Sequence, residues 1–213
     1  MANHHKQSHT LMHHKFDVRH LGALPELASS RLLGLASEVI IGVFFPIFLY
    51  EFFGLSLQWT LFWFAASYLT RIPLLILGAK IFSRTGLVKS MFIGSAFWIG
   101  FYAIAYVLNV APEFHTWTFL GLLIASLSLH NAFYWAPFHV DFAKFTSKKR
   151  RGKQLGTLYA LQRLIGVAGP IVGGFLIATF SYGAAFAVGI GCILASLVPL
   201  SFLPRTNVQY EYG

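Results

Sequence analysis

Several ionisable or strongly polar side chains interrupt long apolar stretches of this chain. They are Glu38, Arg71, His130, Asn131, Gln162 and Arg163. A charge surrounded by hydrocarbon is costly, so such residues mark either ion and ligand pathways or buried pairs. A carboxylate in an apolar site can take up and release a proton, and a nearby arginine keeps it ionised until a ligand displaces that arginine. We therefore expect Glu38, partnered by Arg71 or Arg163, to face a central cavity and carry protons.

A second interpretation remains open for the same residues. Glu38 and Arg71 could form a static ion pair that braces neighbouring helices. His130 could relay protons, or it could be a neutral, hydrogen-bonded core histidine. We expect Tyr134, Trp135 and Gln162 to line the cavity, although aromatic residues that face lipid or the membrane interface are the alternative for the first two.

These residues must be positioned by membrane-spanning helices. Hydrophobic residues make up 56% of the 213 residues and charged residues 11%, which is roughly half the charged fraction of a soluble domain. A helix needs about 20 apolar residues to cross the hydrocarbon layer. The predicted spans are 32–53, 57–79, 88–109, 116–138, 155–179 and 183–203. The fold class is therefore an all-α polytopic membrane protein with six transmembrane helices and no soluble catalytic domain.

Lysine and arginine residues alternate between the two sides of these spans. They occur before the first span, in the second and fourth gaps between spans, and after the sixth span, whereas the other gaps hold none. Because cationic loops stay in the cytoplasm, both the N- and C-termini are predicted to be cytoplasmic. The net charge of +9 then indicates topology and contact with anionic lipid rather than binding of nucleic acid.

The chain divides into three predicted regions. Residues 1–30 form a polar, His-rich cytoplasmic lead, which we expect to be partly disordered, with a short interfacial helix over 18–30. Residues 31–204 form the transmembrane domain, and residues 205–213 begin a cytoplasmic loop. The lead's histidines match no standard ligand spacing, so we expect neither a metal site nor a cofactor.

The loop between the second and third spans carries a recognisable pattern. Residues 78–89 read G-A-K-I-F-S-R-T-G-L-V-K. Aligned on Arg84 and Gly86, this loop resembles the signature G-x-L-A-D-R-x-G-R-K of the major facilitator superfamily (MFS), with Ser83 where that family usually has Asp. In the family this loop joins a charge cluster at the end of helix 4. The resemblance therefore implies a conformational latch in which Asp141 supplies the acid partner of Arg84; a solvated acid beside the loop cations is the alternative.

The fifth span carries a second family-like pattern. A basic stretch over 148–153 precedes a helix that is similar to the superfamily's helix-5 "antiporter" motif G-x8-G-x3-G-P-x2-G-G. The matching positions are Gly156, Gly169, Pro170, Gly173 and Gly174, while Ile165 occupies the second glycine position. Pro170 removes a helix hydrogen bond and can bend the helix, and the glycines allow close helix packing. Packing and a direct role in transport both remain open for this motif.

The resemblance covers residues 20–205 and implies a function. Superfamily members usually have twelve spans in two six-helix halves, so this chain resembles the N-terminal half of an MFS transporter. The implied activity is secondary transport of a small molecule by alternating access, coupled to protons, with efflux by antiport favoured by the helix-5 motif. The implied partners are the lipid bilayer of the plasma membrane, the substrate, protons and a second half, which is either a missing C-terminal half or another chain.

Three alternatives to transport are a structural subunit, an intramembrane enzyme and a channel. The chain could be a six-helix structural or interaction subunit with no transport of its own. An intramembrane enzyme is disfavoured because the sequence has neither G-x-S-x-G nor H-E-x-x-H. A potassium-type channel is disfavoured because T-V-G-Y-G is absent.

Overall fold

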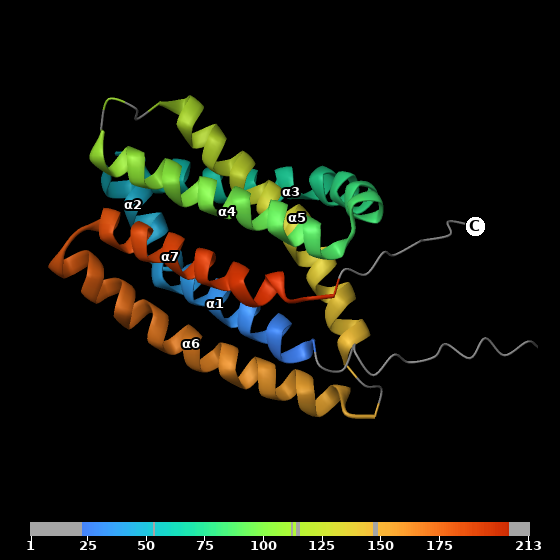
Figure 1. The fold of residues 1–213 in the computed structure, drawn as a ribbon. Coiled ribbons are helices and arrows are strands. Elements are labelled where there is room, and N and C mark those ends of the chain that lie inside the picture. Colours follow the sequence, from blue (N-terminus) through green and yellow to red (C-terminus); the bar gives the residue numbers. More distant parts are fainter. Residues whose placement is uncertain (1–22, 53, 112, 114–115, 147–148, 205–213) are drawn as a thin grey trace, which may run out of the picture.

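A computed structural model describes residues 23–52, 54–111, 113, 116–146 and 149–204 of the chain. This part is helical and contains no strand. The helices are α1 (Leu24–Gly42), α2 (Phe45–Phe52), α3 (Leu57–Thr85), α4 (Leu87–Val110), α5 (Trp117–Phe145), α6 (Arg151–Thr179) and α7 (Tyr182–Ser201) (Figure 1). With α1 and α2 counted as one span, six helical segments are long and apolar enough to cross a membrane. The predicted all-α membrane fold is thereby confirmed. The His-rich cluster of the lead and residues 205–213 lie outside the described residues.

The first span begins earlier in the chain than its hydropathy predicts. Helix α1 starts at Leu24 rather than at residue 32, with Pro25 in its first turn, where a missing N–H costs nothing. Residues 24–30, expected as part of a separate interfacial helix, belong to α1, and so does Arg31. The helix breaks at residues 43–44 because Pro46 has no N–H to donate to the carbonyl of Gly42.

The helices form two groups that face one another across the bundle. Helix α1 packs against α6 and α7, whereas α5 packs against α3 and α4, and contact between α4 and α7 joins the two groups. Helices α1 and α5 touch each other only slightly. Helices α3 and α6 therefore lie on opposite flanks of the pair α1 and α5 (Figure 1).

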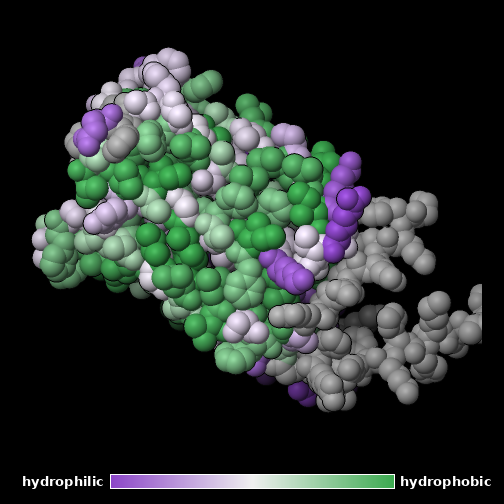
Figure 2. All heavy atoms as spheres, turned by 45° about the horizontal axis from the view of Figure 1, so that its top comes forward, coloured by the Kyte–Doolittle hydropathy of each residue, from purple (hydrophilic) through white to green (hydrophobic). Residues whose placement is uncertain are grey.

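The exterior of the bundle is apolar along its sides. Figure 2 shows hydrophobic residues over most of the visible face, with strongly hydrophilic residues mainly near its ends. The two flanking helices expose large apolar side chains: Leu61, Leu69, Ile72 and Ile76 on α3, and Leu164, Val167, Ile171 and Phe175 on α6. A soluble monomer rarely exposes so much contiguous apolar surface. The chain is an integral, multi-pass membrane protein.

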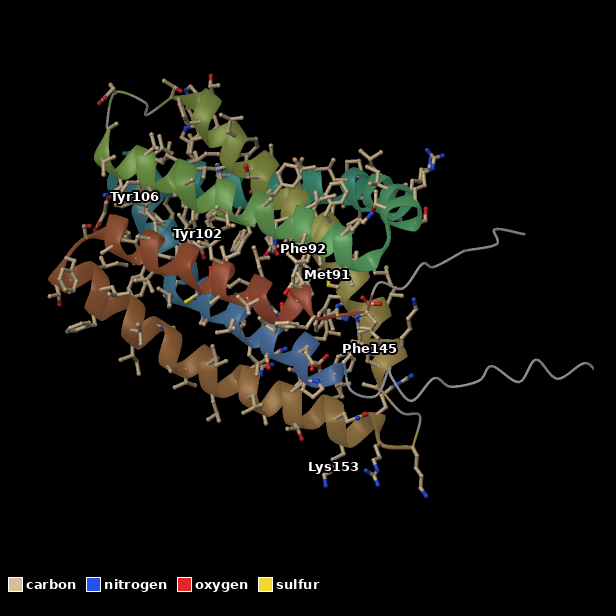
Figure 3. The ribbon with its side chains drawn as sticks, in the orientation of Figure 1. Met91, Phe92, Tyr102, Tyr106, Phe145 and Lys153 are labelled. Atoms are coloured by element: carbon tan, nitrogen blue, oxygen red, sulfur yellow. The ribbon has the colours of Figure 1, made fainter. Side chains whose placement is uncertain are left out.

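Cationic residues gather where four helices begin or end. Arg84 ends α3, Lys89 begins α4, Lys144 ends α5, and Arg151 and Lys153 begin α6. These termini lie at the same end of the bundle, and Figure 3 shows Lys153 extending away from it. We call this end the cation-rich end. It corresponds to the side that the positive-inside rule assigns to the cytoplasm.

Buried side chains fix α4 at the centre of the bundle. Met91, Tyr102 and Leu108 on this helix are almost completely buried, and Figure 3 shows Met91 near the cation-rich end and Tyr102 farther along α4. Tyr102 and Leu108 belong to one apolar cluster, and Met91 belongs to a second that includes Phe145 of α5. Packing on both clusters holds α4 against α5 and α7.

The turn between α3 and α4 explains one glycine of the signature loop. Gly86 has φ 89° and ψ 155°, a backbone conformation that is essentially restricted to glycine. The residues before it are held by local bonds, since the Ser83 hydroxyl donates to the Lys80 carbonyl at 2.8 Å. Gly86 is thus needed for the sharp reversal between two long helices.

Helices α5 and α6 continue through their prolines. Helix α5 passes Pro137 and ends at Phe145, and α6 passes Pro170 and ends at Thr179. Helix α5 therefore continues for about two turns beyond residue 138, the predicted end of the fourth span. The extension brings Asp141 into the helix, where its side chain is fully buried.

Candidate functional site

A cavity of about 350 Å³ lies between α1 and α5, with α3 and α4 forming its other walls. Its polar lining residues are Glu38, Arg71, His130 and Asn131. Its aromatic lining residues are Phe45, Trp63, Phe64, Trp98, Phe101, Tyr102 and Trp135. Small-molecule sites are typically cavities of this kind, mostly apolar and aromatic with a few polar groups that orient the ligand. We call it the central cavity.

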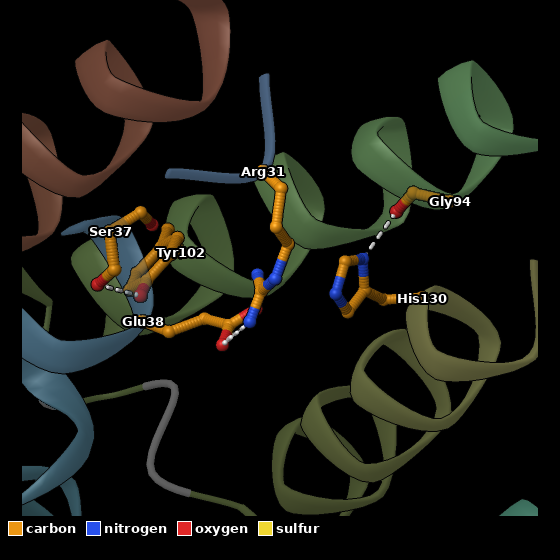
Figure 4. A network of polar contacts seen from close by, with 6 residues as sticks. All are labelled: Arg31, Ser37, Glu38, Gly94, Tyr102 and His130. Carbon is orange, nitrogen blue, oxygen red and sulfur yellow. Dashed lines mark hydrogen bonds and ion pairs between the residues drawn. The ribbon is translucent and has the colours of Figure 1, made fainter. Parts of the chain in front are cut away.

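Glu38, which lines the cavity on α1, forms a partly buried ion pair with Arg31 of the same helix (Figure 4). Arg31 donates to both carboxylate oxygens of Glu38, with Nη1–Oε1 at 2.9 Å and Nη2–Oε2 at 3.1 Å. The side chains of Arg31 and Glu38 are 4% and 26% exposed. The guanidinium carbon also lies 4.4 Å from the ring centroid of Trp135 on α5. Bidentate, charge-assisted pairs of this geometry are among the stronger polar contacts in proteins.

The partner of Glu38 is therefore not the one expected. Pairing with Arg71 or Arg163 is wrong for this structure, because Arg31 occupies both carboxylate oxygens. Arg31 and Glu38 are seven residues apart in one continuous helix, about two turns, so their side chains lie on one face. This pairing needs α1 to start before Arg31, which the hydropathy of the sequence did not indicate.

Arg71 reaches the central cavity from α3 without an acidic partner in the described part of the chain. Its guanidinium carbon lies 4.8 Å from the ring centroid of Tyr68. Its Nε atom is buried and makes no hydrogen bond. Arg71 thus contributes an uncompensated positive charge to the cavity wall.

His130 is held rigidly on α5. Its side chain is 5% exposed, and its Nδ1 lies 2.9 Å from the Gly94 carbonyl of α4 (Figure 4). Because a carbonyl only accepts, Nδ1 carries the hydrogen and Nε2 is the free acceptor of the neutral ring. The ring stacks between Trp98 and Tyr134, with centroids 4.6 and 5.3 Å away. Its neighbour Asn131 donates from Nδ2 to the Leu127 carbonyl at 2.7 Å.

Two further hydrogen bonds tie the cavity helices together. The Tyr102 hydroxyl donates to the Ser37 carbonyl at 2.7 Å, joining α4 to α1 beside Glu38. The Trp63 indole N–H donates to the Leu120 carbonyl at 3.2 Å, joining α3 to α5. Sequence reasoning did not single out these residues. One signal was available for α4, since Trp98 and Tyr102 are four residues apart and share a helical face.

Several residues that were predicted to belong to the functional site do not line the central cavity. Tyr134 is buried in the apolar core, Gln162 is half-buried and Arg163 is exposed on α6, and none of the three lines the central cavity. Of the two predicted aromatic lining residues, only Trp135 reaches it. For the latch, Asp141 is fully buried near the end of α5 while Arg84 is exposed at the end of α3. The latch remains a prediction.

The glycines of the predicted helix-5 motif lie on α6 and separate into two groups. A side chain on Gly169 would collide with Val39 of α1, and one on Gly173 would collide with the Ile40 carbonyl. A Cβ on Gly174 would lie 3.2 Å from the Phe44 ring, whereas one on Gly156 would meet nothing within 4 Å. The motif therefore brings α6 directly against the segment of α1 that carries Glu38.

A small, mainly aromatic cavity with a few polar groups, enclosed by helices that can span a membrane, can bind a small molecule. The sequence matches the Major Facilitator Superfamily over residues 27–211. The chain belongs to this superfamily, whose members are secondary transporters of small molecules. Comparison with curated proteins and with solved structures gave no match.

Proposed function

We propose that this chain exports a small organic solute by alternating access, with the solute bound in the central cavity and a proton moving in the opposite direction. The observation that carries the proposal is the Arg31–Glu38 pair. The Glu38 carboxylate forms part of the cavity wall while it is bound to a buried arginine. Protonation of Glu38 and binding of a solute in the cavity would thus both alter the environment of the Arg31–Glu38 pair.

Protonation of Glu38 would remove one charge of this pair. Arg31 would then be a buried cation without a partner, which is strongly unfavourable. Because α1 carries both residues and packs against α6 and α7, the imbalance favours a different arrangement of α1. The free acceptor of His130, which lines the same cavity, is our candidate for a proton relay to Glu38, and Asn131 for a solute contact.

A second six-helix half completes the transport unit in this proposal. Two of the helices that line the cavity, α1 and α5, lie between α3 and α6, which expose apolar side chains. A second half that packs on these flanks would cover both apolar faces and close the cavity, whether it is part of the same polypeptide or a partner chain. Rocking of the two halves would expose the cavity to each side of the plasma membrane in turn. We retain a latch between the signature loop and Asp141 as part of this motion.

A transport assay tests proton coupling. The chain is reconstituted into liposomes with its second half, covalent or bound, and a panel of labelled neutral, cationic and anionic aromatic solutes is offered with and without a pH gradient. We expect at least one solute to accumulate only when the gradient is imposed. Glu38→Gln should abolish this accumulation while downhill exchange of the solute continues.

Glu51→Gln is the matched control, because Glu51 is an exposed acid on α2 that does not line the cavity. This variant should accumulate solute as the unmodified protein does. Gradient-driven accumulation by Glu38→Gln would remove Glu38 from the coupling mechanism. Transport that is indifferent to the pH gradient would contradict proton coupling itself.

A further inference from the structure

The charges around the central cavity do not balance. Glu38 is neutralised by Arg31 through two hydrogen bonds, so this pair adds no net charge. Arg71, on the facing helix α3, lines the same cavity and has no acidic partner among the described residues. A lone cation within a membrane-spanning helix is costly. The position of Arg71 at a cavity wall is understandable if a bound ligand supplies the opposite charge.

Two residues that line the cavity, Arg71 and Trp98, each carry a hydrogen-bond donor that has no partner. Arg71 Nε and Trp98 Nε1 are both buried donors without a hydrogen-bond partner. Trp98 is only 9% exposed, so water does not readily satisfy its N–H. Buried donors left unpaired are unfavourable. A carboxylate or phosphate accepts several hydrogen bonds at once and suits two donors better than a neutral group does.

One acceptor accompanies these donors. His130 Nε2 is buried without a hydrogen-bond partner, because Nδ1 is engaged by the Gly94 carbonyl. A ligand hydroxyl or N–H group would satisfy it. The remaining wall is aromatic, and the Trp98 and His130 rings stack at 24°. Flat aromatic walls favour a flat, apolar ligand body.

We infer that the solute carried in the central cavity is an aromatic organic anion, with its acidic group bound by Arg71 and the Trp98 indole N–H and its ring held among the cavity aromatics. This inference rests on the proposed transport function, since it names the substrate class of that same cavity. Arg71 is then a substrate-binding residue rather than the partner of Glu38. The Arg31–Glu38 pair remains free to respond to protons.

Three ligands of equal shape and different charge test the inference. They are 2-naphthoate (anionic), 2-naphthamide (neutral) and 2-naphthamidine (cationic). Equilibrium binding of labelled 2-naphthoate to the purified protein with its second half is measured, with the other two as competitors. We expect naphthoate to bind about tenfold or more tightly than the amide, as a charge-assisted contact implies, and the amidine to bind most weakly.

Two substitutions test whether Arg71 causes the preference for the anionic ligand. Arg71→Gln should bring the affinity for naphthoate down to that for naphthamide while leaving naphthamide binding within about twofold of its original value. Arg163→Gln, which removes an exposed cation that does not line the cavity, should leave the preference intact. Naphthamide binding by Arg71→Gln also shows that the variant is folded.

Each other result overturns the inference in a distinct way. Equal binding of the three ligands would show that the cavity binds aromatic solutes without selecting anions, for example because the second half supplies a carboxylate to Arg71. A preference that survives Arg71→Gln would place the anion elsewhere. If none of the three binds, the aromatic-anion class is wrong, while the uptake assay described above still decides separately whether the protein transports.

Discussion

Arg31→Gln is expected to lower the free energy of unfolding by about 3–5 kcal/mol, because it leaves the Glu38 carboxylate partly buried without its cationic partner. The substitution also removes the stacking of the guanidinium on Trp135. The change is measured as the shift of the unfolding midpoint in a fixed detergent, read from tryptophan fluorescence. Arg163→Gln is the matched control, since Arg163 is exposed on α6, and it should leave the midpoint almost unchanged. An Arg31→Gln protein as stable as this control would show that the pair contributes little.

The double variant Arg31→Met with Glu38→Leu separates a static brace from a coupling device. Replacing both members of a buried pair by apolar residues of similar size is often neutral or stabilising, so the fold should recover. If the pair couples protons to transport, the recovered protein should exchange solute downhill but fail to use a pH gradient. Gradient-driven accumulation by the double variant would establish the pair as a structural brace alone.

Gly173→Ala is expected to destabilise the protein by about 3 kcal/mol or more, at the upper end of the cost of overpacking. The added methyl group would meet the Ile40 backbone carbonyl of α1, which cannot rotate away as a side chain can. Helix α6 would have to separate from α1 along the segment that carries Glu38, so solute transport should also fall. Unfolding midpoints and uptake rates are measured in parallel.

Gly166→Ala provides the control within the same helix. Gly166 lies about two turns before Gly173, and a Cβ there meets nothing within 4 Å. Because alanine is the better helix former by about 1 kcal/mol, this variant should be as stable as the original protein or slightly more so. Similar losses in both variants would show that the glycines act through helix flexibility rather than through contact with α1.

The spans were predictable because hydropathy and the alternation of cations are averaged over many residues. The start of α1 was not predictable in this way, because the charge of Arg31 lowers the average hydropathy of the segment in which the helix begins. In the structure this charge is compensated by Glu38, two turns further along α1. A seven-residue spacing of opposite charges is a helical signal, but hydropathy does not record it.

The cavity was only partly predictable, because it depends on how the helices pack. Glu38, Arg71, His130, Asn131 and Trp135 were identified as polar or aromatic interruptions of apolar spans, and the structure places all five on the central cavity. Tyr134 follows His130 in the same stretch of sequence yet points into the core. The rotation of each helix about its axis decides such differences, and it is set by contacts such as Gly169 against Val39 that link residues far apart in the chain.

Side-specific labelling of the cavity tests alternating access most directly. In a Cys192→Ala background, Gly42→Cys places one thiol at the cavity wall, at a site where a Cβ meets no neighbour. Gly191→Cys on α7 is the control, since it is equally unhindered and does not line the cavity. A membrane-impermeant thiol reagent is applied from each side of oriented proteoliposomes that contain the complete transport unit. We predict that Gly42→Cys reacts from both sides and that reversing the pH gradient shifts the ratio of the two rates, whereas the control shows no such shift. Reaction of Gly42→Cys from one side only, under either gradient, would contradict alternating access through this cavity.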